Sequence, residues 1–201
     1  MEISREQIEK RMDFLICADK MKSIYRQTLL ADKSRRETDA EHSWHLALMA
    51  MVFSDLAPEG VDINRVIKMV IIHDLVEIFA GDTFCYDEKA VLDKAERENA
   101  SAEKLFSMLD AELGREYEAL WREFDEGETP DARFAASLDK LQPLVNNYLT
   151  DFHTWKLGNV RKEQVEKRVE TIKNGIPELY YIAEGIIRHG EKTNSFADKK
   201  A

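Results

Sequence analysis

The chain has 201 residues, of which 44% are hydrophobic and 34% are charged, and its formal net charge is −10. This length and composition predict one globular domain that is large enough to bury a core. An acidic surface repels polyanions, so we expect no broad binding to nucleic acid or to an anionic membrane. A small phosphorylated substrate is compatible with this charge, because a few local cations or a metal ion can hold it.

The cysteines and the apolar runs indicate where the protein resides. Cys17 and Cys85 do not have the spacing of a metal-binding or redox motif. The first ten residues are charged and lack the apolar core of a secretory signal. The longest apolar runs, at 46–53 and 69–72, are too short to span a bilayer. We therefore expect a cytoplasmic protein with reduced thiols.

Eight glycines and four prolines in 201 residues favour long helices over many short strands. Thr38 or Asp39 is suited to cap one helix, and Asp62 is suited to cap the next. We expect an all-α bundle in which residues 1–190 form a single domain and the polar residues 191–201 form a frayed tail. The expected helices span about 4–19, 39–56, 62–79, 87–110, 113–125, 130–155, 160–173 and 177–190.

Ionisable residues interrupt a helix that is otherwise almost wholly apolar. Residues 44–53 and 66–79 are apolar on most helical faces, which predicts that both helices are central and buried. An ionisable group in such a helix is costly unless it is paired or bound to a metal ion. His73, Asp74 and Glu77 fall within five residues of one another. Their clustering indicates a functional site.

A metal site would need ligands from more than one helix. His73 and Asp74 are adjacent and point about 100° apart on a helix, so they can supply part of such a site. His42 opens the second apolar helix, and Asp139 lies in the apolar run of a later helix. Imidazole and carboxylate ligands suit a divalent ion such as manganese, cobalt, iron, nickel or zinc. Because no thiolate accompanies them, a structural zinc site is disfavoured.

The order of these four residues, together with the motifs around them, resembles the HD-domain phosphohydrolase superfamily, and most closely its 5′-deoxynucleotidase branch. The motifs are Glu-His-Ser-Trp at 41–44, His-Asp-Leu-Val-Glu-Ile-Phe-Ala-Gly-Asp at 73–82 and Leu-Asp-Lys-Leu at 138–141. The resemblance extends from about residue 10 to residue 190. It implies an HD-domain helical bundle with a mononuclear site, in which one divalent metal ion is held by His42, His73, Asp74 and Asp139.

The resemblance also implies which residues act on the substrate, a (deoxy)nucleoside 5′-monophosphate. Glu77 matches the residue that orients or activates the attacking water, and Asp82 matches the general acid for the leaving 5′ oxygen. Arg26, in the motif Ile-Tyr-Arg, matches a phosphate-binding arginine, whose planar fork suits phosphate oxygens. Lys140 follows the last metal ligand and either contacts phosphate or pairs with an acid of the pocket.

Two residues near these motifs leave alternatives open. The bacterial deoxynucleotidases carry a tryptophan directly after the phosphate-binding arginine, whereas this chain has Gln27. Selectivity against a 2′-hydroxyl group is therefore an open question. His45 lies one helical turn after His42 and is either a fifth ligand or a neighbour that packs beside the ligands. We expect the second role.

The resemblance leaves rival functions, which are an HD-type phosphodiesterase, an alarmone hydrolase, and a non-catalytic regulator that binds metal or nucleotide. Glu77 and Asp82 argue against a regulator, because a pure binder needs no proton donor. HD proteins with two metal ions have further histidines between the His-Asp pair and the last aspartate, and residues 75–138 contain none. We therefore expect one ion and a monoester substrate. Because the family commonly forms dimers, we also expect a homodimer.

Overall fold

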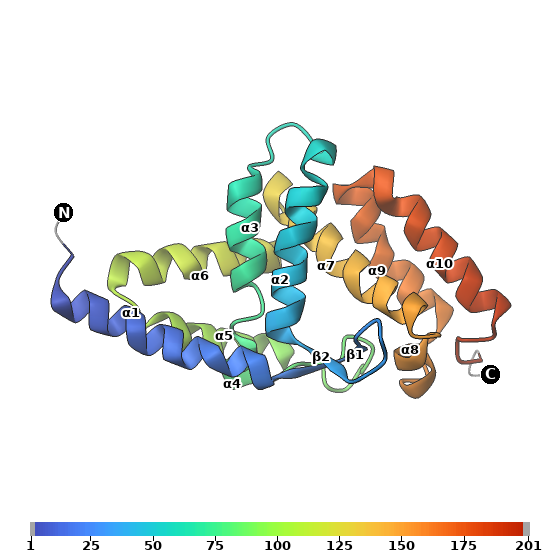
Figure 1. Cartoon of the computed structure of the whole chain (residues 1–201), viewed down its shortest axis with the longest axis horizontal. Coiled ribbons are helices and arrows are strands. Elements are labelled where there is room, and N and C mark those ends of the chain that lie inside the picture. The colour runs from blue at the N-terminus through green and yellow to red at the C-terminus, as the bar shows by residue number, and fades with distance from the viewer. Residues whose placement is uncertain (1–2, 199–201) are drawn as a thin grey trace.

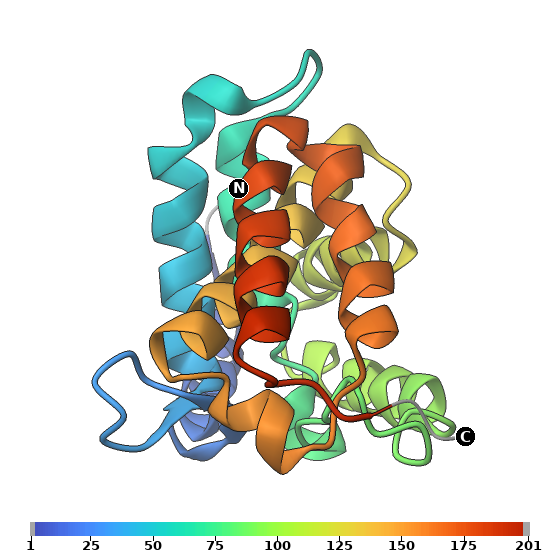
Figure 2. The same cartoon turned by 90° about the vertical axis from the view of Figure 1, so that its right-hand side faces the viewer.

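The fold is organised around one long helix. In the computed structural model, which describes residues 3–198, α7 packs against α2, α3, α6, α9 and α10 (Figures 1 and 2). The expected all-α bundle is confirmed. The helices are α1 (Arg5–Ala18), α2 (Asp39–Val52), α3 (Ile63–Ile72), α4 (Glu77–Ala80), α5 (Lys94–Phe106), α6 (Ala111–Glu126), α7 (Pro130–Leu149), α8 (His153–Leu157), α9 (Lys162–Gly175) and α10 (Tyr180–Lys192).

A short hairpin precedes α2 and was not predicted. Strands β1 (Tyr25–Leu29) and β2 (Arg36–Thr38) pair antiparallel, with Tyr25 opposite Thr38. Strands this short do not develop the alternating pattern by which a strand is recognised in a sequence. The hairpin matters for the site, because its register brings Arg26 beside Asp39, the first residue of α2.

Local signals define where the central helices begin. The Thr38 side chain accepts a hydrogen bond from the Glu41 backbone, and the Glu41 side chain accepts one from the Thr38 backbone, which is a capping box. Asp62 caps α3 in the expected way. Both caps were predicted, and the first one places His42 in the first turn of α2.

The helix predicted over 62–79 is not continuous. It ends at Ile72, a turn follows over residues 73–76, and the short helix α4 begins at Glu77. The hydrophobic pattern alone could not show this break, because Leu75 and Val76 continue the apolar run through the turn. His73 and Glu77 therefore do not belong to one continuous helix. The turn over residues 73–76 sets the directions of their side chains instead.

The helix predicted over 130–155 also divides. It ends at Leu149, and Asp151 and Phe152 take positive φ angles of 53° and 59° before α8 begins. Positive φ is uncommon for residues other than glycine, so a sequence gives little warning of such a turn. Pro143 lies inside α7, which continues through it. The predicted helix at 87–110 begins only at Lys94, after a run of turns.

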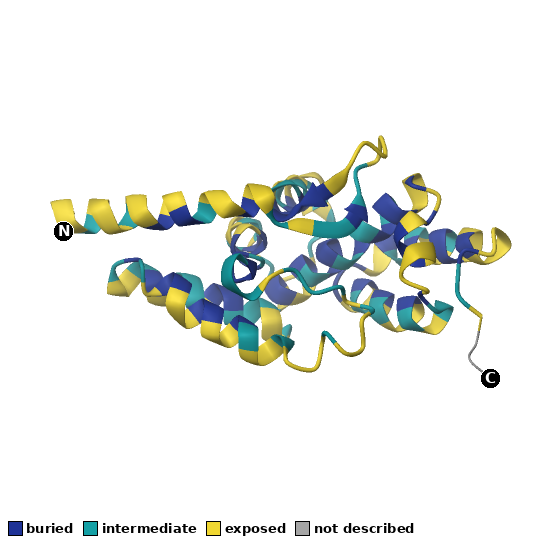
Figure 3. Ribbon diagram, turned by 90° about the horizontal axis from the view of Figure 1, so that it is seen from below, coloured by how far each residue is buried: buried dark blue, intermediate teal, exposed yellow. Residues whose placement is uncertain are grey.

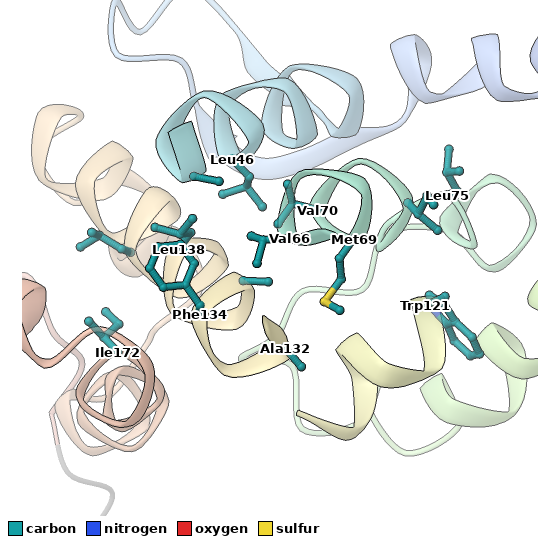
Figure 4. Packing of buried hydrophobic residues seen from close by; sticks show 14 of the residues in the cluster. Leu46, Val66, Met69, Val70, Leu75, Trp121, Ala132, Phe134, Leu138 and Ile172 are labelled. Atoms are coloured by element: carbon teal, nitrogen blue, oxygen red, sulfur yellow. The ribbon is translucent and has the colours of Figure 1, made fainter. Parts of the chain in front are cut away.

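The hydrophobic core lies between α2, α3 and α7 and continues toward α6 and α9 (Figure 4). Leu46, Val66, Val70 and Leu138 meet at its centre, and each is fully buried. Full burial of a Leu or Val side chain contributes about 1.5–3 kcal/mol. This packing holds the three helices that carry the candidate metal ligands.

The helices α1 and α2 expose apolar side chains, and Figure 3 shows that much of α1 is exposed. Leu15 and Ile16 on α1 are 58% and 67% exposed, and Trp44 and Met51 on α2 are 64% and 60% exposed. The expectation that the helix at 44–53 is buried on most faces is therefore wrong, because one side of it faces outward. Among residues 3–198, no helix has the length and apolarity that crossing a membrane requires.

The C-terminal tail does not fray over the part that the structure describes. Phe196 stacks on Trp155 with ring centroids 4.9 Å apart, and Ser195 is buried. The Ala197 backbone donates a hydrogen bond to the Val160 carbonyl over 2.9 Å. The polar composition of residues 191–201 predicts a frayed tail, but the one aromatic residue among them, Phe196, anchors the tail to the rest of the fold. Residues 199–201 of the predicted tail lie outside the described residues.

Candidate active site and metal centre

Three helices bring the predicted ligands together. His42 comes from the first turn of α2, the His73–Asp74 pair from the end of α3, and Asp139 from the middle of α7. His42 Nε2 lies 3.0 Å from Asp139 Oδ1 and 3.9 Å from Asp74 Oδ2. His73 Nε2 lies 3.0 Å from Asp74 Oδ2 and 3.7 Å from Asp139 Oδ1. His42, His73 and Asp139 therefore converge on one point, and Asp74 lies beside the two histidines.

Both imidazole rings are oriented by their other nitrogen. His73 Nδ1 lies 2.8 Å from the Val70 carbonyl oxygen, and His42 Nδ1 lies 3.0 Å from Gln142 Oε1. Because each acceptor needs a proton from Nδ1, each ring presents Nε2 to its neighbours. Such fixed tautomers are typical of metal-ligating histidines.

These residues fit a divalent cation. The ligand atoms of His42, His73 and Asp139 all lie within 4.8 Å of one another, and all three residues are buried. His73 Nε2 is a buried atom with no aligned hydrogen-bond partner among the described residues. Ligand atoms bound to one ion at about 2.1 Å lie roughly 3 Å apart in octahedral geometry, as several of these atoms do. The donor set of imidazole and carboxylate suits the same ions that the sequence predicts.

The two histidines differ in basicity. Burial lowers the pKa of His73, but the Asp74 and Asp139 carboxylates outweigh burial and raise it to about 9. Burial and the nearby positive charge of Arg26 lower the pKa of His42 to about 4. A metal ligand must be a neutral imidazole, so binding a cation at this site displaces a proton from His73.

An acidic group, formed by Asp39, Glu77 and Asp82, adjoins the candidate metal ligands. Ligand atoms of Asp39, Glu77 and Asp82 lie within 4.8 Å of one another, which is close enough to hold a cation or share a proton. Burial raises the pKa of Glu77 far above its usual value, and the negative charges of Asp74 and Asp39 raise it further. Burial and the charge of Asp74 also raise the pKa of Asp39 to about 7. At least one carboxyl of this group therefore carries a proton at neutral pH.

Arg26 links the candidate metal ligands to the acidic group. Its Nη1 donates to Asp74 Oδ2 over 2.6 Å and to Asp39 Oδ1 over 3.2 Å. Arg26 was predicted as a phosphate ligand from the resemblance alone. Here it also neutralises a candidate metal ligand and a residue of the acidic group, so it has a structural role in the site.

Asp82 lies on a loop that Arg97 holds in place. Gly81 precedes it with a φ of 78°, which glycine adopts without strain. Arg97 donates to the Ala80 carbonyl over 2.6 Å and to Thr83 Oγ1 over 3.0 Å, on the two sides of this turn. Burial raises the pKa of Asp82, which makes it a better proton donor at neutral pH.

A pocket of about 250 Å³ opens beside the candidate ligands. Its wall includes Glu77, Asp82 and Lys140, and Lys140 Nζ forms an ion pair with Asp139. The pocket also includes cations and aromatic residues that the sequence analysis did not single out: Phe84, Tyr86, Lys94, Trp155 and Arg168. Lys94, Trp155 and Arg168 come from segments that are remote in sequence from the motifs, so no local pattern could have indicated them.

A network behind His42 was also missed. Gln142 Nε2 donates to Glu37 Oε1 over 2.6 Å while Gln142 Oε1 accepts from His42. Thr28 and Asn146 donate to the other oxygen of Glu37. His45 Nδ1 lies 3.3 Å from Gln142 Nε2, so it packs beside this network, as expected. The sequence feature that could have indicated this network is the spacing of Gln142, which lies one helical turn after Asp139 on α7.

Comparisons with known proteins agree with this geometry. The family model of the HD domain matches residues 18–180. A crystal structure described as a predicted metal-dependent phosphohydrolase from Magnetospirillum magnetotacticum is 44% identical and has a TM-score of 0.90. That match covers 96% of this chain and 100% of the other. An HD-domain phosphohydrolase from Listeria innocua is 19% identical with a TM-score of 0.59, and it shares the fold.

Curated relatives have a more specific name. The 5′-deoxynucleotidase HDDC2 of Xenopus laevis is 26% identical over 160 residues, which cover 74% of this chain and 76% of the relative. The protein of that name in Danio rerio is 28% identical over 109 residues, which cover 54% of this chain and 53% of the relative. The match of the family model over most of the chain, together with the close structural relative, shows that this chain belongs to the HD-domain family.

Proposed function

We propose that this protein is a metal-dependent phosphomonoesterase that hydrolyses deoxynucleoside 5′-monophosphates to nucleoside and phosphate. The observation that carries the proposal is the convergence of His42, His73 and Asp139 at a pocket whose wall also holds Glu77 and Asp82. The names of the relatives supply the substrate class.

We propose that His42, His73, Asp74 and Asp139 hold one divalent ion. Such an ion, when bound, polarises a phosphoryl oxygen and lowers the pKa of a coordinated water. The chain's own contribution is to fix the ligands: Gln142 and the Val70 carbonyl orient the rings, and Arg26 holds Asp74. The identity of the ion is a matter for reconstitution with manganese, cobalt, iron, nickel and zinc in turn.

We assign proton transfer to the acidic group. Glu77 and Asp39 share a proton, and the carboxylate that the pair retains can accept a proton from the attacking water. Asp82 lies on the pocket wall with a raised pKa and can donate a proton to the leaving 5′ oxygen. Arg26 and Lys140 place positive charge beside the same pocket, where a phosphate dianion would bind.

The experiment is a phosphate-release assay with the purified chain, first stripped of metal and then reconstituted with each ion. Deoxynucleoside and ribonucleoside 5′-monophosphates are compared, with 3′-monophosphates as the matched control. We expect release from 5′-monophosphates and little release from 3′-monophosphates. Because Gln27 lines the pocket, the ratio of deoxy to ribo rates measures whether this chain discriminates at the sugar.

We also propose that the protein is a cytoplasmic homodimer. The exposed apolar residues Trp44, Met51 and Val52 on α2 lie on one candidate interface, because apolar patches on a surface commonly mark contacts. The two cysteines are free thiols, which suits a reducing compartment. Light scattering with Met51→Glu as the disrupting variant tests the dimer, and fractionation of cells that produce the protein tests its location.

A further inference from the structure

An arginine on α9 lines the candidate active site and forms no ion pair with any residue that the structure describes. Arg168 lines the pocket that contains His73, Asp74 and Asp139, and its side chain is partly buried. Over residues 3–198, the structure records neither a hydrogen bond nor an ion pair for it. A guanidinium withdrawn from water is normally bonded to an acceptor, because its five N–H donors lose solvent there. The donors of Arg168 are therefore available to a molecule that enters the pocket.

The other cations of the pocket are engaged. Arg26 donates hydrogen bonds to Asp74 and Asp39. Lys94 Nζ lies 3.2 Å from Glu98 Oε1, and Lys140 forms an ion pair with Asp139. Each of them already balances a carboxylate. Arg168 thus differs from every other positive side chain that lines the pocket in the described part of the chain.

Arg168 and Lys140 line the same pocket from two helices that are in contact. Ser137 Oγ of α7 donates to the Thr171 carbonyl of α9 over 3.0 Å, which fixes the helix that carries Lys140 against the helix that carries Arg168. A phosphate group in the pocket can therefore meet two positive charges that come from different helices.

We propose that Arg168 and Lys140 together bind the phosphoryl group of the substrate and give the pocket its preference for a dianionic phosphate monoester. This inference rests on the proposed function. Arg168 supplies a planar fork that can bond two phosphate oxygens at once, and Lys140 supplies a point charge. Arg26 is then chiefly the partner of Asp74, and Arg168 is the guanidinium with free donors.

The test compares R168Q with K167Q, a control that removes the same charge from the adjacent, exposed position of α9. Binding of inorganic phosphate to the metal-loaded protein is measured by calorimetry. We expect R168Q to weaken phosphate binding by on the order of 10–100-fold, the value of one or two charged hydrogen bonds, and K167Q to leave it unchanged. Product inhibition by an uncharged deoxynucleoside should not change in either variant. Equal phosphate affinity in R168Q and K167Q would overturn the inference.

R168K keeps the charge and loses the fork, so it serves where R168Q does not fold. We expect R168K to bind phosphate more weakly than the wild-type protein, and wild-type affinity in R168K contradicts bidentate binding. The two proposals fail separately. If the wild-type protein cleaves no nucleotide but phosphate binding still depends on Arg168, the proposed function is wrong and this inference holds. If it cleaves 5′-monophosphates and R168Q retains wild-type phosphate affinity, the proposed function holds and this inference is wrong.

Discussion

At the scale of single residues, the strongest features are the fixed ring orientations of His42 and His73. Each Nδ1 is occupied by an acceptor, so each Nε2 faces Asp74 and Asp139. A buried imidazole in a packed core normally has both nitrogens satisfied, yet His73 Nε2 has no aligned hydrogen-bond partner among the described residues. The geometry therefore supports a cation site at this point of the molecule.

His73→Ala should lose the bound ion and the activity together. The variant removes one nitrogen ligand and leaves Asp74 and Asp139 facing each other without it. Elemental analysis of reconstituted and desalted protein gives the ion content, and His153→Ala at an exposed position is the control. Full ion content in His73→Ala would remove this residue from the site.

Glu77→Gln should keep the ion at the histidine site and lose about 10²–10⁴-fold in turnover, the usual contribution of a positioned acid or base. Gln has nearly the same shape as Glu but cannot take up a proton. The kcat of metal-loaded protein is the measurement, with ion content determined on the same sample. Turnover within a few-fold of the wild-type value shows that Glu77 takes no part in proton transfer.

Gln142→Leu should weaken metal binding by about 10–100-fold, as is typical when a partner that orients a metal ligand is removed. The substitution frees the His42 ring and leaves Glu37 without its shortest hydrogen bond. Competition with a fluorescent chelator measures the dissociation constant. An unchanged constant would mean that packing alone holds the ring.

At the scale of elements, the close contact of α7 and α9 positions Asp139, Lys140 and Arg168. Gly175 allows this approach, because a Cβ built there would lie 2.2 Å from the Arg133 carbonyl oxygen and 2.2 Å from Ser137 Oγ. Backbone cannot move aside as a flexible side chain can. The helices therefore cannot accept a larger residue at this position without separating.

Gly175→Ala should destabilise the fold by about 1–3 kcal/mol, as overpacking does. Gly185→Ala in α10 is the matched control, since no atom lies within 4 Å of a Cβ added there. The control should be neutral or stabilising by about 0.5–1 kcal/mol, because alanine favours helix. Urea unfolding of both variants measures the difference, and equal stability of the two would show that the helix contact is not tight.

The helices and the ligands were predictable to different degrees. The bundle, the caps at Thr38 and Asp62, and the convergence of His42 with Asp139 follow from periodicity and from the motifs. The hairpin, the turn at 73–76 and the break after Leu149 do not, because each depends on tertiary contacts or an unusual backbone angle. Asp39 and Arg168 carry no local signal for their roles, which arise only when distant segments pack together, and the one signal for Gln142 is its spacing from Asp139.

At the scale of the whole molecule, metal binding and folding should be coupled. A folded chain that binds an ion, when the unfolded chain does not, gains about 2.7 kcal/mol at a ligand concentration of 100 times Kd. We propose that residues 1–190 form the single domain that gains this stability, with α10 and the docked residues up to 198 completing its surface. Addition of the ion should therefore raise Tm, and His73→Ala should abolish the increase.

The size of this Tm increase should depend on pH. Because the folded-state pKa of His73 is raised to about 9, protonated His73 stabilises the metal-free fold most fully below the unfolded value of about 6.5. That contribution is lost as pH rises through about 9. The ion must displace the proton, so the metal-induced increase in Tm should be larger at pH 8 than at pH 6. A larger increase at pH 6 would contradict the assignment.

In our proposal, the converging His and Asp residues make this chain a metal-dependent 5′-nucleotidase. The most direct measurement is phosphate release from a deoxynucleoside 5′-monophosphate by metal-stripped protein, before and after a divalent ion is restored, with cyclic dinucleotides assayed beside it. We predict that the ion restores release from the monophosphate, that His73→Ala prevents this, and that the cyclic dinucleotides stay intact. Cleavage of cyclic dinucleotides that is faster than phosphate release, or no release with any of the five ions, would contradict the account.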